Sequence, residues 1–168
     1  MSRGRFALAG VTMLAYVVSQ ANLGRLVGSL EPNILALQLS FSGQAFWAVA
    51  SAWGPEGVRQ YLDHFPYDFV HPFVYGGMGL VWVRDTPLFA GWSAGVRRYW
   101  AWSLPVAGVC DLVENVLHIV LLSSVPGSGH HLALVAGLAA SCKWTLAVLF
   151  ALALAGGTVR QLKRHAVG

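Results

Sequence analysis

The chain has 168 residues, of which 56% are hydrophobic and 11% are charged, and its mean hydropathy is +0.58. This composition excludes an ordinary soluble domain and indicates an integral membrane protein. The net charge of +4 does not indicate a nucleic-acid partner, because Lys and Arg flank apolar segments and form no basic surface interleaved with aromatic residues. The length suits a single membrane domain over residues 1–168, with the lipid bilayer as its partner.

The apolar segments predict an all-α fold, in which four transmembrane helices form an integral membrane bundle. The predicted spans cover residues 6–23, 67–83, 100–122 and 132–156, and the second is the shortest. Lys and Arg concentrate before the first span, after the fourth, and in the loop over residues 84–99. By the positive-inside rule, this loop and both termini are cytoplasmic, which places the protein in the cell inner (cytoplasmic) membrane.

The first span has a second interpretation, as a cleavable signal peptide. Arg3 and Arg5 precede an apolar stretch that ends in the small-residue pattern Ser19-Gln20-Ala21. If the segment is retained, the number of spans is even and the basic ends fall on one side of the membrane, as the charge pattern requires. We therefore treat it as the first helix.

Residues 25–66 form a long external segment between the first two spans. From Phe41 to Ala52, apolar residues recur at helical spacing, and Pro55 suits the first turn of a second helix. We expect two short amphipathic helices at the outer interface. They would cover the end of the bundle and pack there rather than move as a lid.

Small residues recur at a spacing of four in the last span and allow close helix packing. They form two rows, and the second span adds glycines: Ala133, Gly137 and Ser141; Ala147, Ala151 and Ala155; Gly76, Gly77 and Gly79. These faces also offer a route to a homo-oligomer. Cys110 and Cys142 fall in apolar runs at different expected depths, so we interpret them as packed thiols without a disulfide.

Four polar residues interrupt the apolar third span. Asp111, Glu114, Asn115 and His118 are spaced i, i+3, i+4 and i+7, so they project from one helix face. An Asp near the bilayer centre costs roughly 2.5 to 3.5 kcal/mol, so two uncompensated carboxylates would cost about 5 to 7 kcal/mol. These side chains must therefore face protein, water or a ligand.

Further polar residues stand in the neighbouring spans. Asp68 and His71 open the second span, and Lys143 lies near mid-depth of the fourth, where it needs an acidic partner such as Asp111 or Glu114. We therefore predict a pocket in the outer half of the bundle, covered by the external segment. Its predicted lining is Asp68, His71, Asp111, Glu114, Asn115, His118 and Lys143.

The same residues also have purely structural interpretations. Asp68 would cap the second helix. Asp111 and Lys143 would be a buried pair that only fixes helix register. Glu114 and His118, which are one turn apart, would hydrogen-bond each other.

Three chemistries fit the cluster. Asp111 and Glu114 would be catalytic as a proton donor and an acceptor that act on a lipid-like substrate. A metal would find carboxylate and imidazole ligands, but the spacing lacks the Glu-x-x-His pair of di-iron bundles, so we assign no metal ligand. Haem would require facing histidines, for which His71 and His118 are the pair available, and the cofactor is left unknown.

Two elements of the chain resemble a family of small uncharacterised bacterial membrane proteins. They are Tyr67-Asp68-Phe69-Val70-His71-Pro72-Phe73-Val74-Tyr75-Gly76 and the segment from Leu104 to Asn115, which contains Asp-x-x-Glu-Asn. The resemblance covers roughly residues 40–122 and implies no activity, but it implies importance for Asp68, Asp111, Glu114 and Asn115. The chain departs from the family at His71, usually aromatic, and at His118, usually aliphatic. In architecture alone, it is similar to the sterol isomerase and sigma-2 receptor superfamily, whose helical bundles hold acidic residues in an intramembrane ligand cavity.

The leading hypothesis for function is therefore a pocket that binds a small amphiphilic or lipid-like molecule, with proton-transfer chemistry at Asp111 and Glu114. Whether a reaction is catalysed is left open. The alternative is a non-enzymatic structural or partner-docking protein, in which the polar cluster fixes helix packing and the bundle is filled. A metal-binding or ion-pathway protein ranks third. The spacing lacks a Glu-x-x-His pair for a metal, and the inner halves of the spans carry almost no polar residues for an ion pathway.

Overall fold

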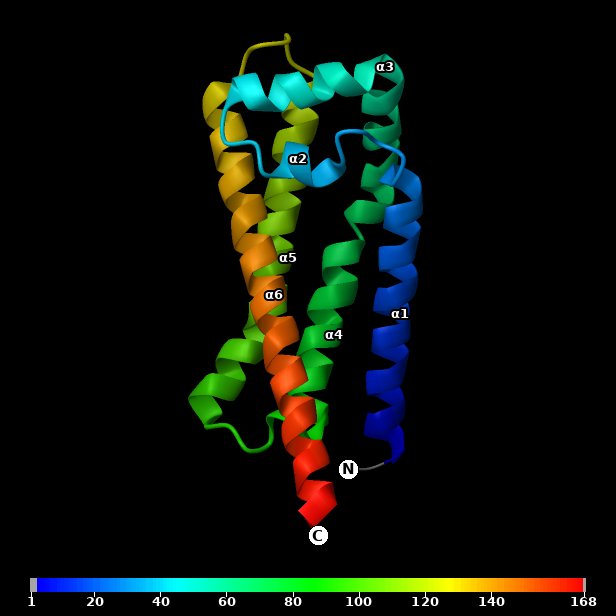
Figure 1. Ribbon diagram of the computed structural model, residues 1–168, viewed down its shortest axis with the longest axis vertical. Coiled ribbons are helices and arrows are strands. Elements are labelled where there is room, and N and C mark those ends of the chain that lie inside the picture. Colours follow the sequence, from blue (N-terminus) through cyan, green and yellow to red (C-terminus); the bar gives the residue numbers. More distant parts are fainter. Residues whose placement is uncertain (1–2, 168) are drawn as a thin grey trace.

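The computed structural model describes residues 3–167, and these residues form helices without any strand. The helices are α1 (Arg3–Val27), α2 (Ile34–Gln38), α3 (Gly43–Asp68), α4 (His71–Asp85), the short 3-10 helix η1 (Pro87–Phe89), α5 (Ala94–Leu122) and α6 (His130–Val167). Figure 1 shows α1, α4, α5 and α6 side by side along the long axis. The α2 helix and the first part of α3 lie at the end opposite the two termini (Figure 1).

Three of these helices are long and apolar enough to cross a membrane, within the part of the chain that the structure describes. They are Gly4–Val27, Ala94–Leu122 and His130–Arg164. Large apolar side chains on their outer faces are exposed, among them Phe6, Leu14, Val109, Leu138 and Leu152. A protein that leaves such faces bare is suited to a lipid solvent, so the structure supports the assignment as a membrane protein.

The helix of the predicted second span is shorter than the helices of the other three predicted spans. This helix, α4, covers His71–Asp85, and these 15 residues rise only about 22 Å, less than a hydrocarbon core of about 30 Å. Pro72 stands in the first turn, where its missing N–H costs nothing, and this sets the helix start. Asp68 is the last residue of α3, and the N-cap position of α4 is Val70, without a side-chain cap. The interpretation of Asp68 as the cap of this helix is therefore wrong.

The predicted external segment contains α2 and a bent α3. At Gly54 the backbone takes φ 65° and ψ −177°, a conformation that suits glycine, and Pro55 follows directly. The first arm of α3 begins after Ser42, whose hydroxyl accepts a hydrogen bond from the amide of Ala45, and it lies across the end of the bundle. The second arm turns down beside α1 and leads into α4 (Figure 1). We had expected this segment to stay at the outer interface, but the second arm of α3 extends away from that interface along α1.

The long helices pack as a row. In the described residues, α1 packs against α4, α4 against α5 and α5 against α6, whereas α1 and α6 at the ends of the row do not pack closely. Glycines permit the α4–α5 approach, since a Cβ on Gly79 would lie 2.9 Å from Leu104 and one on Gly108 would lie 3.2 Å from Pro72. Gly77, in contrast, faces open space.

The two small-residue rows of α6 have different surroundings. In the first row Ala133 is buried, and a Cβ on Gly137 would lie 2.7 Å from the carbonyl of Ser40, so this row packs closely. In the second row Ala151 and Ala155 are exposed. The second row therefore does not pack against another helix of the chain over its full length.

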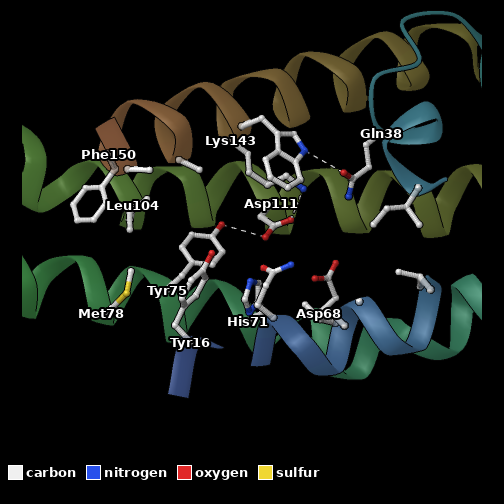
Figure 2. Close-up of a pocket in the computed structure, with 18 of the residues that line it drawn as sticks. Tyr16, Gln38, Asp68, His71, Tyr75, Met78, Leu104, Asp111, Lys143 and Phe150 are labelled. Atoms are coloured by element: carbon white, nitrogen blue, oxygen red, sulfur yellow. Dashed lines mark hydrogen bonds and ion pairs between the residues drawn. The ribbon is translucent and has the colours of Figure 1, made fainter. Parts of the chain in front are cut away.

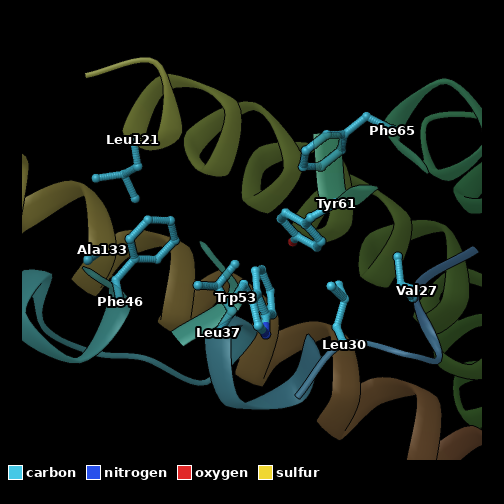
Figure 3. Packing of buried hydrophobic residues seen from close by; sticks show 9 residues of the cluster. All are labelled: Val27, Leu30, Leu37, Phe46, Trp53, Tyr61, Phe65, Leu121 and Ala133. Carbon is cyan, nitrogen blue, oxygen red and sulfur yellow. The ribbon is translucent and has the colours of Figure 1, made fainter. Parts of the chain in front are cut away.

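Two apolar clusters hold the bundle together. Figure 3 shows the cluster at the α2–α3 end, formed by Val27, Leu30, Leu37, Phe46, Trp53, Tyr61, Phe65, Leu121 and Ala133. The other cluster lies nearer the termini and contains Tyr75, Met78, Val83, Phe89, Ala101, Leu104, Ala107, Phe150 and Ala153. On α5 the polar residues fall between Ala107 of one cluster and Leu121 of the other, so the polar site lies between two apolar layers.

Candidate functional site

Lys143 of α6 is the centre of the polar site. Its Nζ lies 2.9 Å from Asp111 Oδ1 and 2.6 Å from Glu114 Oε2, both on α5. All three residues are buried, with exposed fractions of 7% for Lys143, 3% for Asp111 and 0% for Glu114. The acidic partner expected for this lysine is thus a pair of carboxylates, which compensates the cost of burying the ammonium group.

The second carboxylate oxygen of Asp111 is also engaged. Asp111 Oδ2 accepts a hydrogen bond of 3.1 Å from the hydroxyl of Tyr75 on α4 (Figure 2). Tyr75 was not among the predicted site residues, although it stands four residues, about one helical turn, after His71. Asp111 therefore joins three helices, α4, α5 and α6.

A cavity of about 240 Å³ opens beside this network. Four predicted residues line it, namely Asp68, His71, Asp111 and Lys143. Most other lining residues are apolar or aromatic and come from α1, α4, α5 and α6: Met13, Tyr16, Leu23, Val27, Tyr75, Met78, Leu104, Trp144, Ala147, Phe150, Ala151 and Leu154. The cavity therefore combines charged groups with apolar walls, as ligand sites commonly do.

Figure 2 shows how these groups are distributed along the cavity. The carboxylate of Asp68 and the amide of Gln38 lie toward one end, and Met78, Leu104 and Phe150 lie toward the other. Gln38 comes from α2, and its Oε1 accepts a hydrogen bond of 3.1 Å from the indole of Trp144. The external segment therefore contributes a wall to the cavity through α2.

Glu114, Asn115 and His118 do not line the cavity, although they share the helix face of Asp111. They are almost completely buried behind it. His118 Nδ1 is hydrogen-bonded at 2.8 Å to the hydroxyl of Tyr61 on α3, and it lies 3.9 Å from Glu114 Oε1, too far for the hydrogen bond that we had considered. The predicted pocket lining is thus divided into a cavity wall and a buried layer.

Asp68 pairs with a histidine that sequence reasoning missed. His64 Nε2 lies 3.5 Å from Asp68 Oδ2, and His64 Nδ1 donates a hydrogen bond to the carbonyl of Tyr61. Both residues belong to α3, where they are one turn apart, and both line the cavity. The i, i+4 spacing before Asp68 was the available signal.

His71 links α4 to the first helix. Its Nδ1 is hydrogen-bonded at 2.8 Å to Ser19 Oγ, and its ring stacks on Tyr16 with 5.8 Å between centroids. Gln20 also lines the cavity. Residues that suggested a signal-peptide cleavage pattern therefore form part of the site, because α1 packs against α4.

The structure also bears on the two cysteines and on the metal-binding hypothesis. Cys110 is half-buried and Cys142 is exposed, so the expectation of two packed thiols is wrong for Cys142. They stand next to Asp111 and Lys143 in sequence, and that ion pair sets their common depth. Among the described residues, no group of three or more His, Cys, Asp or Glu side chains is arranged to hold a metal ion.

Comparison of the chain with models of protein families, with curated proteins and with solved structures finds no match. The class of protein is therefore defined by the fold and the site alone. It is an all-helical protein with three helices of membrane-spanning length and a partly charged cavity between them.

Proposed function

We propose that the protein binds a small amphiphilic or lipid-like molecule within the membrane, in the cavity beside Lys143. The observation that carries this proposal is the combination of a cavity of about 240 Å³ with buried charged groups at Asp68, Asp111 and Lys143 and with apolar walls. A bundle that needed only stability would fill this space with side chains, since protein interiors are close-packed. The charged groups would hold the polar end of the molecule, and the apolar walls would hold its chain.

The proposal includes a helical bundle that crosses the membrane four times. The second arm of α3 and α4 together cover residues 55–85, and about 30 residues at 1.5 Å per residue rise about 45 Å, enough for a bilayer core even with the break at Phe69 and Val70. A discontinuous helix is tolerated at membrane depth where its free backbone groups face a cavity or protein. The positive-inside rule then puts both termini and η1 in the cytoplasm, the Asp68 end of the cavity toward the outer side, and the end formed by Leu104 and Phe150 toward the cytoplasmic side.

Proton-transfer chemistry on the bound molecule would centre on Asp111. This carboxylate lines the cavity and already accepts one hydrogen bond from Tyr75 and another from Lys143. Glu114 does not line the cavity, so it would act on the bound molecule only indirectly, by holding Lys143, whose Nζ lies 2.6 Å from Glu114 Oε2. We therefore propose Asp111 as the group that meets the molecule and Glu114 as a residue that positions Lys143.

A structural role is the second candidate, and the double ion pair of Lys143 favours it. A lysine held by carboxylates at 2.9 and 2.6 Å fixes the register of α5 against α6 without any ligand. In this version a partner, or a second copy of the chain, would dock on small residues that the fold leaves exposed, such as Ala155. The cavity would then have no resident molecule.

Native mass spectrometry of the purified protein, released from mild detergent, tests the two candidates. We expect a retained adduct with the mass of a lipid-like molecule. Ala147→Phe should displace the adduct, because Ala147 lines the cavity, and Ala155→Phe on the same helix should leave it in place, because Ala155 is exposed and lies outside the lining. No adduct on the wild type, or equal retention by both variants, would contradict the binding proposal.

A second experiment separates binding from helix packing. Asp111→Asn combined with Glu114→Gln removes both acids with little change in side-chain volume. A folded bundle that has lost its adduct supports the binding proposal, whereas disassembly of the bundle supports the structural role. Folding is read from thermal unfolding and from size-exclusion chromatography in the same detergent.

A further inference from the structure

The acidic groups around the cavity outnumber the cationic ones. Two carboxylates, Asp68 and Asp111, line the cavity and a third, Glu114, lies behind it, whereas Lys143 is the only Lys or Arg among the lining residues that the structure describes. Lys143 is already shared by Asp111 and Glu114. Asp68 faces the same cavity with only an imidazole beside it, His64 at 3.5 Å.

Aromatic rings also line the cavity, and Tyr16 and Tyr75 lie between the Asp68 end and Met78 (Figure 2). Tyr16, Tyr75 and Trp144 line it together with His71, whose ring packs against both tyrosines. The indole face of Trp144 already carries a cation, because Lys143 Nζ lies 5.5 Å from its ring centroid. Carboxylates with aromatic faces form the usual environment of a bound ammonium group, because the ring face is the negative pole of its quadrupole.

The apolar end of the cavity fixes an orientation for a bound amphiphile. Met78 stands ten residues after Asp68 and lines the opposite end of the cavity with Leu104 and Phe150 (Figure 2). At 240 Å³ the cavity lies below the range of about 300 to 1,000 Å³ found for drug-sized ligands, so it suits one hydrocarbon chain better than two. The chain has room to extend toward the bilayer, because α1 and α6 both line the cavity without packing closely on each other in the described part of the protein.

We infer that the cavity takes a cationic single-chain amphiphile, with its ammonium head against Asp68 and its chain directed toward Met78 and Phe150. This inference rests on the proposed binding function and names the chemical class of the molecule. The positive head would give Asp68 a permanent counter-charge, in addition to the titratable imidazole of His64 at 3.5 Å. An anionic head would instead meet an excess of carboxylates and be repelled.

The test compares three amphiphiles of equal chain length on the whole protein in dodecyl maltoside. Tetradecyltrimethylammonium is cationic, tetradecyl maltoside is neutral and tetradecanoate is anionic. Binding to the folded state raises Tm by an amount that grows with the ratio of ligand concentration to Kd. We expect the cationic compound to raise Tm by several degrees, the neutral compound to raise it less, and the anionic compound to leave it unchanged.

Asp68→Asn is the decisive variant. It should weaken binding of tetradecyltrimethylammonium at least about tenfold, because a buried charge contact is lost, and it should leave the smaller effect of tetradecyl maltoside intact. That retained effect also shows that the variant is folded. Asp63→Asn is the matched control, because Asp63 stands on the same arm of α3 but is exposed and outside the cavity lining, and it should behave as the wild type.

The possible outcomes separate this inference from the function on which it rests. Equal Tm shifts with all three compounds, or a cationic shift that survives in Asp68→Asn, overturn the cationic class but leave an amphiphile site standing. A larger shift with tetradecanoate overturns the class in favour of an anionic head. No shift with any compound, together with no adduct in native mass spectrometry, overturns the proposed binding function itself.

Discussion

Substitution of Lys143 by methionine is the sharpest perturbation of the polar site. The change keeps an unbranched side chain and removes the ammonium group that contacts Asp111 at 2.9 Å and Glu114 at 2.6 Å. After this change the two carboxylates differ in the hydrogen bonds that they keep. Asp111 keeps the hydrogen bond from Tyr75, whereas Glu114 keeps no hydrogen bond from the described residues and has His118 only at 3.9 Å.

The magnitude follows from this difference. Breaking a buried ion pair costs about 3 to 5 kcal/mol in soluble proteins, and polar pairs within membranes couple by about 0.6 to 2 kcal/mol. Since Glu114 would be left buried and without a compensating group, we expect Lys143→Met to lower the free energy of unfolding by about 3 kcal/mol, near the insertion cost of one central carboxylate. Adding Glu114→Gln to this variant should restore about 2 kcal/mol, because the charge that lacks a partner is then gone.

The assay is reversible unfolding in mixed micelles, followed by circular dichroism at pH 8 and pH 5. The deficit of Lys143→Met relative to the wild type should shrink at pH 5, because a carboxyl group that takes up a proton no longer needs a cation beside it. The wild type keeps its ion pairs, so its stability should change less over this interval. A variant as stable as the wild type at pH 8, or a second substitution that restores nothing, would refute the assignment of Lys143 as the counter-ion of Glu114.

Four further changes probe the packing around the site. Gly137→Val should destabilise the bundle by about 1 to 3 kcal/mol through a clash with a backbone carbonyl before α3, whereas Gly77→Ala, which faces open space, should be neutral or stabilising by up to about 1 kcal/mol. Tyr61→Phe should cost about 1 to 3 kcal/mol in the same unfolding assay, because the buried imidazole behind the cavity loses its hydroxyl partner. Mild oxidation should join Cys110 to Cys142 within one chain, seen as a loss of about 2 Da by mass spectrometry, and two unreacted thiols would contradict the α5–α6 register.

The helices could be predicted from the sequence because apolar runs are long in three places. The run that predicted a first span, 6–23, lies within α1, which continues to Val27, and the run 132–156 lies within α6, which continues to Val167. Hydropathy detects the membrane-embedded part of a helix and not its polar extension, so these ends were set too early. The bend at Gly54 could be expected from the adjacent proline, but the downward path of the second arm depends on packing against α1.

The candidate site could be predicted in part for a geometric reason. Positions spaced i, i+3, i+4 and i+7 occupy about 100° of a helix circumference. An arc of this width reaches two neighbours, so Asp111 faces the cavity while His118 packs against α3. The spacing alone cannot divide the face between them. The contribution of α1 was missed for another reason, because Ser19 is an isolated polar residue whose partner, His71, is known only once α1 packs on α4.

On the polar face of α5, Asp111 lines the cavity, whereas Glu114, Asn115 and His118 form a buried layer behind it that supports the cavity wall. Hydrogen bonds and ion pairs lead from the cavity wall into the buried layer through Tyr75, Asp111, Lys143 and Glu114, and back to the wall through His118, Tyr61, His64 and Asp68. Glu114 and His118, where the two halves of this series meet, lie 3.9 Å apart without a hydrogen bond. Both ends of this series line the cavity, so a charge placed against Asp68 acts on groups that also hold Lys143. Electrostatic interactions are strong in such a low-dielectric interior. The buried residues therefore hold the walls of the cavity in position, and under the proposed function we expect substitution within the layer to alter binding without direct contact with the bound molecule.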